Sequence, residues 1–267
     1  MNGEVFRIEH TEAVTGIKNY SICITTYKYR FEKWLKPLVD TIKSFRPNIE
    51  VLIAINGENK QSFDEDYRKN ILEYTSTKKN TFITMYPNYR GLCKLWNNLL
   101  INSTNHKVLL LNDDISITNV NFFDSLEKKI ETEIRIFKIN GSWSHAFMDR
   151  TFVDQLGWFD ERYLSIGHED DDFEWRFGKS TKGKNIPNVH LPNIVNHVDH
   201  DNCLIGMEKV MGKYAKFNLD FTFSQKYKVD DKNGENYGMV NRNLVCISPT
   251  PPLHMAESFY WNNRNKL

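Results

Sequence analysis

One apolar run, residues 108–111, constrains the fold more than any other part of the sequence. Its four consecutive apolar side chains leave it no polar face. This is typical of a central strand in a parallel sheet whose two faces are both covered. The run ends abruptly in Asn112, Asp113 and Asp114. We expect these polar side chains at the carboxyl edge of the sheet, where open α/β sheets bind their ligands.

Short apolar runs alternate with segments of helical periodicity along most of the chain. We expect further strands at residues 20–26, 49–55, 81–85 and 137–143, and helices at residues 31–45, 66–74, 92–100, 122–129, 151–156 and 170–177. This alternation predicts an α/β fold with a mostly parallel central sheet flanked by helices. The composition changes after about residue 205. We therefore expect one domain over residues 1–205 and a C-terminal extension over residues 206–267 packed on it.

Charge and hydropathy exclude several classes of protein. The 267 residues include 35 Lys and Arg against 34 Asp and Glu, which gives no electrostatic case for nucleic acid as a partner. No apolar run approaches the roughly 18–20 residues of a membrane span, and the first residues lack the apolar segment of a signal peptide. The four cysteines are not paired at metal-site or redox spacing. We expect a cytoplasmic protein.

A second polar cluster, residues 169–172, contains four consecutive acids and is followed by Arg176. Packed like charges raise one another's pKa values, whereas the start of a helix stabilises an ionised carboxylate. A carboxylate held in this way can accept a proton from a hydroxyl group. Asp172 and Arg176 are spaced for an ion pair on one helix face. The same pattern is also compatible with a solvated acidic helix start.

Two histidines follow in a polar segment, His197 and His200. Either imidazole could complete a metal shell begun by Asp114. Oxygen ligands such as Asp114 and Asn112 suit Mg²⁺ or Mn²⁺, which often bind substrate phosphates as well. Taken alone, histidines in a polar loop are more commonly surface residues.

The order of these segments resembles the inverting glycosyltransferases of the GT-A fold, of the family 2 type that builds bacterial polysaccharides. The resemblance covers about residues 20–200. Asn112, Asp113 and Asp114 stand at the family's DxD motif, with Asn112 in place of the first acid. Residues 157–161 look like its Gly-Gly-Phe-Asp-Glu segment, and residues 169–176 match its Glu-Asp-x-Asp-x3-Arg motif.

The donor-binding part of the resemblance is spread over three further segments. Thr26 and Tyr27 look like the end of the family's first strand, which lies against the nucleotide, and Asn56 looks like the end of its second. Ile55 occupies a place where the family usually has an acid. The family's Asn-x-Gly-x5-Asn segment is similar to the stretch that contains Asn88, Gly91 and Asn97, with one extra residue after Asn88.

The resemblance implies transfer of a sugar from a nucleotide-diphosphate sugar, of which UDP-sugars are the commonest, to a glycan hydroxyl. It implies a hexosyl- or N-acetylhexosaminyltransferase that depends on Mn²⁺ or Mg²⁺ and inverts the anomeric configuration, with Asp170 as the base. Glu169 and Trp143 are expected to contact the acceptor. The expected metal ligands are Asn112, Asp114 and His197, and the expected donor contacts are Thr26, Tyr27, Asn56, Asn88, Gly91, Asn97 and Asp113.

Three other interpretations stand beside this one. Ile55 and Asn112 favour a catalytically degenerate nucleotide- or carbohydrate-binding module. A nucleotidyltransferase normally has a glycine-rich loop after its first strand, and residues 25–30 contain no glycine. A third possibility is a scaffold role of the C-terminal segment within a polysaccharide-assembly complex. Phe259, Trp261 and Arg264 belong to an aromatic and basic tail that suits a membrane surface, although we favour packing of this tail on the domain.

Overall fold

The computed structural model describes residues 20–27, 30–57, 65–164, 166–198, 216–229 and 244–263. The chain divides into two compact units. The first unit comprises residues 1–89, 98–152 and 187–203, and the second comprises residues 90–97, 153–186 and 204–267. Each unit therefore draws on segments that lie far apart in the sequence. The predicted boundary between residues 205 and 206 stays a prediction.

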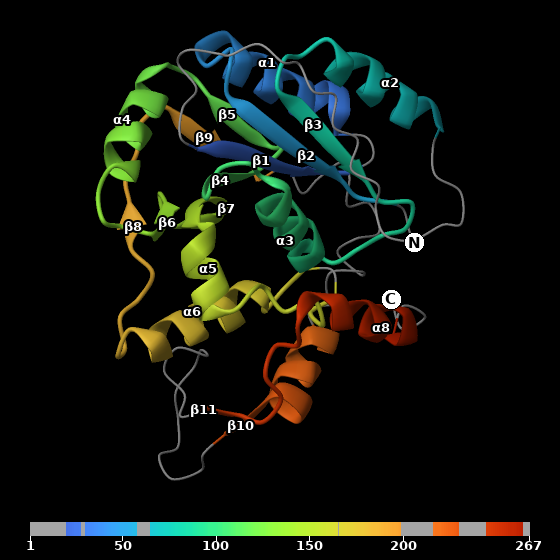
Figure 1. The fold of residues 1–267 in the computed structure, drawn as a ribbon, viewed down its shortest axis with the longest axis vertical. Coiled ribbons are helices and arrows are strands. Elements are labelled where there is room, and N and C mark those ends of the chain that lie inside the picture. The colour runs from blue at the N-terminus through green and yellow to red at the C-terminus, as the bar shows by residue number, and fades with distance from the viewer. Residues whose placement is uncertain are drawn as a thin grey trace. The chain divides into compact units, whose positions relative to one another are not determined.

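The first unit is built on a seven-stranded sheet with the order β3-β2-β1-β4-β7-β6-β8 (Figure 1). Neighbouring strands among β1, β2, β3 and β4 are parallel, as are β6 and β8, whereas β7 is antiparallel to both β4 and β6. The bounds are β1 Ser21–Thr26, β2 Glu50–Ile55, β3 Thr81–Met85, β4 Lys107–Asn112, β6 Ile136–Ile139, β7 Ser142–Asp149 and β8 Asn188–Val189. The predicted α/β fold with a mostly parallel sheet is confirmed.

Strand β4 is the central strand, as its apolar run predicts. It pairs with β1 on one side and with β7 on the other, and residues 108–111 are all buried. Leu111 lies opposite Ile24 in β1 and His145 in β7. Because β1 and β4 are parallel neighbours, Thr26 and Asn112 end at the same edge of the sheet.

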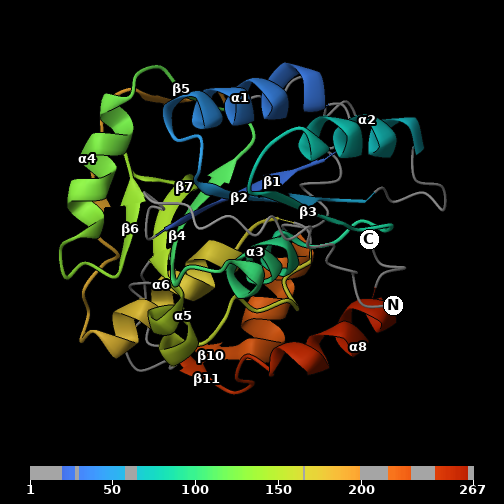
Figure 2. The same cartoon turned by 45° about the horizontal axis from the view of Figure 1, so that its top comes forward.

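Helices cover the sheet on the side where the main apolar core of the first unit forms. Helix α1 (Lys36–Phe45), which continues a π-helical turn η1 (Phe31–Leu35), lies beside α2 (Glu65–Ser76) on one face of the sheet (Figure 2). Leu38, Val39 and Ile42 form the buried stripe of α1. Burial of such side chains contributes about 1.5–3 kcal/mol each. Helix α4 (Asn121–Ile130) adds Phe122, Phe123 and Leu126 to the same core.

The expected single strand over residues 137–143 is wrong. These residues form the end of β6, a two-residue turn at Asn140 and Gly141, and the start of β7. Both turn residues have positive φ angles, 49° and 80°. Asn-Gly is the sequence that favours this type of hairpin turn, so the turn was readable from the sequence. A second antiparallel pair that the sequence analysis missed joins β5 (Ile115–Ile117) to β9 (Ile194–Asn196).

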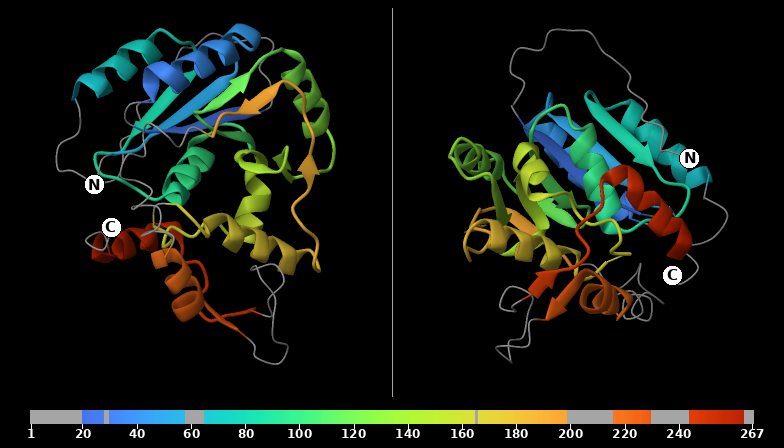
Figure 3. Two further views of the ribbon diagram at one scale, coloured as in Figure 1. Left: turned by 180° about the vertical axis from the view of Figure 1, so that it is seen from behind. Right: turned by 60° about the horizontal axis from the view of Figure 1, so that its bottom comes forward.

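The second unit contains the acidic helix and the C-terminal segment. Helix α6 (Glu169–Ser180) confirms the predicted helix, and β10 (Tyr227–Val229) pairs antiparallel with β11 (Leu244–Cys246) (Figure 3). Trp175 of α6 packs against Tyr227 and Leu244 in one apolar cluster. The second unit also contains the π-helical turn η2 (Thr222–Lys226) and helix α8 (Leu253–Asn263). Two helices are divided between the units: the last residues of α5 (Arg150–Leu156) and the first residues of α3 (Leu92–Asn102) belong to the second.

The C-terminal tail is only partly described. The Phe259 ring packs against Phe221, with 5.7 Å between the ring centroids, while Arg264 lies outside the described residues. No helix within the described ranges combines the length and the apolar character needed to cross a bilayer. Attachment of the tail to a membrane surface stays a prediction.

Candidate functional site

In the first unit, two adjacent acids at the carboxyl end of β4, Asp113 and Asp114, are both paired with Arg30. The Asp113 carboxylate accepts hydrogen bonds from Arg30 Nε at 2.7 and 2.9 Å and from Thr26 Oγ1 at 2.6 Å. Arg30 also lies 3.1 Å from Asp114 through Nη2 and Oδ2. Burial raises the pKa of Asp113, and the opposing effects of Arg30 and Thr26 leave it at about 6. One guanidinium therefore serves two adjacent carboxylates.

The sequence analysis missed Arg30. The sequence gives little reason to single out Arg30, because a basic residue between a first strand and the helix that follows it is common. The position becomes meaningful only when β1 and β4 lie side by side. Arg30 itself is 4% exposed, and its guanidinium pairs with Asp113 and Asp114 at this edge of the sheet.

Asp114 and His197 come together through the β5–β9 pair. The His197 backbone N–H donates to the Asp114 carbonyl oxygen at 3.0 Å. The His197 ring has Nε2 2.6 Å from Ser116 Oγ and lies 4.7 Å from the Trp34 ring. Among the described residues, no group of three or more His, Cys, Asp and Glu side chains converges on a metal position. His200 lies outside the described residues.

Besides Asp113, four of the expected donor-binding residues lie at or shortly after the ends of β1, β2 and β3 in the first unit. Thr26 is bonded to Asp113, and the Tyr27 carbonyl accepts a hydrogen bond from Tyr67 at 2.7 Å. The Asn56 side chain accepts from the N–H of Gly57 at 3.0 Å. The backbone at Asn88 passes close to Gly57, since a Cβ on Gly57 would lie 2.4 Å from the Asn88 carbonyl carbon. Their contacts with a donor stay predictions.

The other two expected donor-binding residues, Gly91 and Asn97, belong to the second unit. Asn97 is fully buried, and its amide bonds the loop that precedes α6. Its Oδ1 accepts from Phe159 N at 3.1 Å, while its Nδ2 donates to Phe159 O at 2.8 Å and to Glu161 Oε1 at 3.1 Å. Asn97 thus fixes the conformation of residues 159–161, and a contact of its side chain with a donor stays a prediction.

The two tryptophans considered for sugar stacking lie in different units. Trp143 is half-buried in β7, and the Lys138 ammonium lies 6.0 Å from its ring centroid. Trp158 precedes Phe159, and its indole N–H donates to Asp154 Oδ1 at 3.0 Å. Stacking of a sugar on Trp143 stays a prediction.

His145 is a buried polar residue that the sequence analysis did not single out. It lies in β7 opposite Leu111, and its Nδ1 has no hydrogen-bond partner among the described residues. Burial lowers the pKa of His145 to about 4. The ring is therefore neutral at physiological pH.

In the second unit, the first turn of α6 carries two carboxyl groups with raised pKa values, the buried Glu169 and the half-buried Asp170. Burial and the neighbouring Asp170 raise the pKa of Glu169 to about 8. Burial and Asp171 raise the pKa of Asp170. Glu169 is 4% exposed, and its Oε2 has no hydrogen-bond partner among the described residues. At neutral pH, Glu169 is therefore mostly protonated.

The backbone before this turn is bent. Gly167 and His168 have positive φ angles of 109° and 67°, which turn the chain into the helix. His168 Nδ1 then lies 3.0 Å from Asp171 Oδ2. Asp171 is half-exposed on its side chain and faces this histidine, so the four consecutive acids have different environments.

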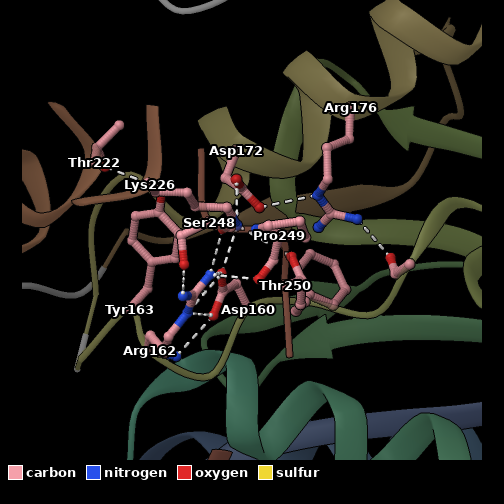
Figure 4. Close-up of polar contacts among 12 residues, drawn as sticks. Asp160, Arg162, Tyr163, Asp172, Arg176, Thr222, Lys226, Ser248, Pro249 and Thr250 are labelled. Atoms are coloured by element: carbon pink, nitrogen blue, oxygen red, sulfur yellow. Dashed lines mark hydrogen bonds and ion pairs between the residues drawn. The ribbon is translucent and has the colours of Figure 1, made fainter. Parts of the chain in front are cut away.

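Asp172 points into a buried network of ion pairs (Figure 4). Arg176 Nε lies 3.0 Å from Asp172 Oδ2, which confirms the predicted helix-face pair. Asp160 in the loop before α6 is paired with Arg162 at 2.7 Å. Lys226 lies 2.5 Å from Asp160 and 2.7 Å from Asp172. Burial raises the pKa of Asp160, but Lys226 and Arg162 outweigh it and hold the value at about 2.

The buried carboxyl of Glu169 makes a prediction for the pH dependence of stability. A carboxyl with a pKa raised from 4.5 to about 8 stabilises the fold fully below pH 4.5 and loses this contribution as the pH rises through about 8. We expect the melting temperature of Glu169→Gln to fall less than that of the wild type between pH 4.5 and 8.5. Thermal melts at a series of pH values measure this difference.

The control for this prediction is Glu131→Gln, because Glu131 is exposed. Its melting temperature should follow the wild type at every pH. Parallel pH profiles for Glu169→Gln and the wild type would contradict the assignment of a buried, protonated Glu169.

Comparisons with known proteins give similarities in structure alone. No protein-family model and no curated protein sequence matches the chain. Glucosyl-3-phosphoglycerate synthase from Mycobacterium tuberculosis, solved with Mn²⁺, UDP and glucosyl-3-phosphoglycerate, superposes with a TM-score of 0.53 at 12% identity. The match covers 92% of this chain and 98% of that one.

Two further solved structures are similar over a shorter stretch. GalNAc-T7, solved with UDP, GalNAc and Mn²⁺, has a TM-score of 0.52 at 10% identity, with 66% of this chain and 43% of that chain covered. The mannosyltransferase PcManGT from Pyrobaculum calidifontis, solved with GDP-Man and Mn²⁺, has a TM-score of 0.50 at 11% identity. This match covers 66% of the chain and spans about half of the mannosyltransferase, 55% of its length. The chain has the GT-A fold, as the resemblance predicted.

Proposed function

We propose that this chain is a glycosyltransferase that moves a sugar from a nucleotide-diphosphate sugar, of the UDP class, to a hydroxyl of a glycan acceptor. The observation that carries the proposal is the first turn of α6, where the buried Glu169 and the half-buried Asp170 both have raised pKa values in a chain of GT-A fold. A carboxylate whose pKa is shifted toward neutral pH is suited to general base catalysis. A binding module has no need for such a pair.

The donor diphosphate is assigned to the carboxyl edge of β4. Asp114 offers a carboxylate and His197 an imidazole from adjacent segments, with the Asn112 amide at the end of the strand. Oxygen and imidazole groups of this kind would hold Mn²⁺ or Mg²⁺. When bound, a divalent cation neutralises charge on the leaving diphosphate. The presence of Mn²⁺ with nucleotides in the solved structures of similar fold supports this assignment.

Arg30 gives this edge a defined charge. Because it neutralises Asp113, only part of the acidic charge is available to a cation. Asp113 then acts through its hydrogen bonds to Thr26 and Arg30, which hold the ends of β1 and β4 together for the nucleotide. The remaining donor contacts are assigned to Tyr27, Asn56, Asn88, Gly91 and Asn97.

Asp170 is assigned as the base. It takes the proton of the acceptor hydroxyl while the hydroxyl oxygen bonds to the anomeric carbon and the bond from this carbon to the diphosphate breaks. A single displacement of this kind inverts the anomeric configuration. Glu169, which holds its proton at neutral pH, is suited to donate a hydrogen bond to an acceptor oxygen, and Trp143 is suited to stack on a sugar ring.

The donor sugar is proposed only as a hexose or an N-acetylhexosamine. The solved structures of similar fold include enzymes named for glucosyl, mannosyl and N-acetylgalactosaminyl transfer. We place the chain in bacterial polysaccharide synthesis in the cytoplasm, with an acceptor that is lipid-linked if the protein associates with the membrane. These assignments rest on the resemblance of the motifs.

A catalytically degenerate nucleotide- or carbohydrate-binding module is the second candidate. Two observations favour it. Ile55 is fully buried at the end of β2, where the resemblance implies an acid. The Asn112 amide oxygen accepts a hydrogen bond from Thr25 Oγ1 at 3.3 Å, which occupies part of its capacity to bind a cation. This candidate predicts nucleotide binding without any consumption of donor.

The role of Asp170 is tested with Asp170→Asn. A general base contributes on the order of 10²–10⁴-fold to the rate, so we expect kcat to fall by this factor while the affinity for UDP stays unchanged. Asp220→Asn is the matched control, because Asp220 is an exposed aspartate of the same unit and lies outside the acidic turn of α6. Transfer by Asp170→Asn at a rate close to that of the wild type would rule out this role.

The metal assignment is tested with Asp114→Ala. We expect the wild type to bind UDP tightly with Mn²⁺ and weakly with EDTA, because a cation held by Asp114 would neutralise charge on the diphosphate. The variant should show the weak affinity under both conditions, whereas Asp66→Ala on the exposed surface of α2 should behave as the wild type. Isothermal titration calorimetry measures both affinities. Equal affinity of the wild type with and without Mn²⁺ would contradict the assignment.

A further inference from the structure

Lys226 carries a buried ammonium group that the proposed chemistry does not use. Its side chain is fully buried, and lysine is almost never found in this state unless it is paired. All three N–H donors have acceptors: Asp160 Oδ2 at 2.5 Å, Asp172 Oδ1 at 2.7 Å and Thr250 Oγ1 at 3.1 Å (Figure 4). The rings of Tyr163 and Tyr227 lie 5.4 and 5.6 Å from the ammonium nitrogen.

Neutralisation of the two aspartates does not require Lys226. Asp160 is already paired with Arg162, and Asp172 is already paired with Arg176. The network therefore contains three cations and two carboxylates. The contribution of Lys226 is geometric, because its ammonium joins the loop that carries Asp160 to the helix that carries Asp172. Arg176 of the same helix adds hydrogen bonds to the carbonyl oxygens of residues 156–158.

Other contacts of the C-terminal segment bind the same two elements. The Tyr227 hydroxyl donates to Asp172 Oδ1 at 2.5 Å. Arg162 donates to Ser248 Oγ at 2.6 Å, to its carbonyl oxygen at 2.9 Å and to the Pro249 carbonyl oxygen at 3.0 Å. The segment thus holds the loop and α6 through both side-chain and backbone atoms.

Asn218 forms hydrogen bonds with the backbone directly before the acidic turn. Its amide donates to the Leu164 carbonyl at 2.9 Å and to the Gly167 carbonyl at 2.7 Å, and its Oδ1 accepts from the Leu164 N–H at 2.9 Å. Gly167 is two residues before Glu169, at the point where the backbone has its positive φ angle. The conformation that starts α6 is therefore fixed by a residue of the C-terminal segment.

We propose that Lys226 is a positioning residue, through which the C-terminal segment sets the place of Asp170 by joining Asp160 to Asp172. This inference rests on the proposed function for the role of Asp170, but its structural part does not. Buried ion networks are poor sources of net stability and are better suited to fixing one arrangement. Misplacement of a reacting group by about 1 Å can cost on the order of 10²-fold in rate.

The variant that tests the proposal is Lys226→Met, which removes the ammonium and keeps most of the side-chain volume. Each aspartate retains its own arginine, so the interior stays free of an unpaired carboxylate. We expect kcat for sugar transfer to fall about 10²-fold, while KM for the donor and affinity for UDP change less than about 2-fold. Lys226→Arg, which restores a buried cation, should recover part of the lost kcat.

A second measurement does not depend on activity. Hydrogen exchange of the backbone amides of residues 168–173 should become at least about 10-fold faster in Lys226→Met, because the turn loses the ion pair between Lys226 and Asp172. The amides of β1 and β4, which belong to the other unit, should keep the wild-type rate. Lys184→Met, an exposed lysine of the second unit, is the control for both measurements. Tyr227→Phe, which removes a single hydrogen bond to Asp172, provides a milder variant if Lys226→Met does not fold.

The outcomes separate this proposal from the proposed function. A Lys226→Met protein with a lower melting temperature but unchanged kcat, KM and exchange of residues 168–173 would show that the network is structural only, and would overturn the proposal. A wild type that transfers no sugar from any nucleotide sugar would contradict the proposed function. The exchange measurement would still decide whether Lys226 positions the turn.

Discussion

The second unit depends on one buried cation shared by two carboxylates. Desolvation of Lys226, Asp160 and Asp172 is costly, and the cost is met only because every donor and nearly every acceptor in the network finds a partner at close range. Such an arrangement admits few alternatives. The loop at residues 157–163, the start of α6 and the C-terminal segment all contribute to the network, so a packing that separates them would leave the Lys226 ammonium buried without its carboxylates.

The surroundings of the buried acids shift their pKa values in opposite directions, so that some stay ionised and others keep their proton at neutral pH. Asp160 is surrounded by cations, which hold its pKa at about 2, so it remains ionised and structural. Among the described residues no cation pairs with the buried Glu169, which keeps its proton to about pH 8. Between these extremes, Asp113 has a pKa of about 6, set by burial against Arg30 and Thr26. The raised pKa values of Glu169 and Asp170 leave the first turn of α6 able to exchange protons near neutral pH.

The elements that the sequence predicted are those with a local signal. The apolar run at residues 108–111 identified β4, and the spacing of Asp172 and Arg176 identified an ion pair within α6. The hairpin turn at Asn140 and Gly141 also had a local signal, the Asn-Gly pair, which the strand assignment ignored.

The residues that the sequence could not predict are those whose partners are distant. Lys226 is one lysine among many until the fold places it against Asp160 and Asp172. Arg30 gains its role only when β1 lies beside β4. Asn97 fits a motif of the resembling family, but the described contacts of its amide are with Phe159 and Glu161. Periodicity and motif spacing report neighbours along the chain, whereas burial of charge is decided by tertiary contacts.

The central claim, that the chain transfers sugar by a single displacement at the acidic turn of α6, is tested most directly by the configuration of the product. A panel of UDP-sugars in which the sugar is α-linked to the diphosphate would be supplied with Mn²⁺ and a glycan acceptor, and the anomeric proton of the product would be followed by NMR. The account predicts consumption of at least one donor and a β-linked product. A product with the α configuration retained, or no consumption of any nucleotide sugar, would contradict it.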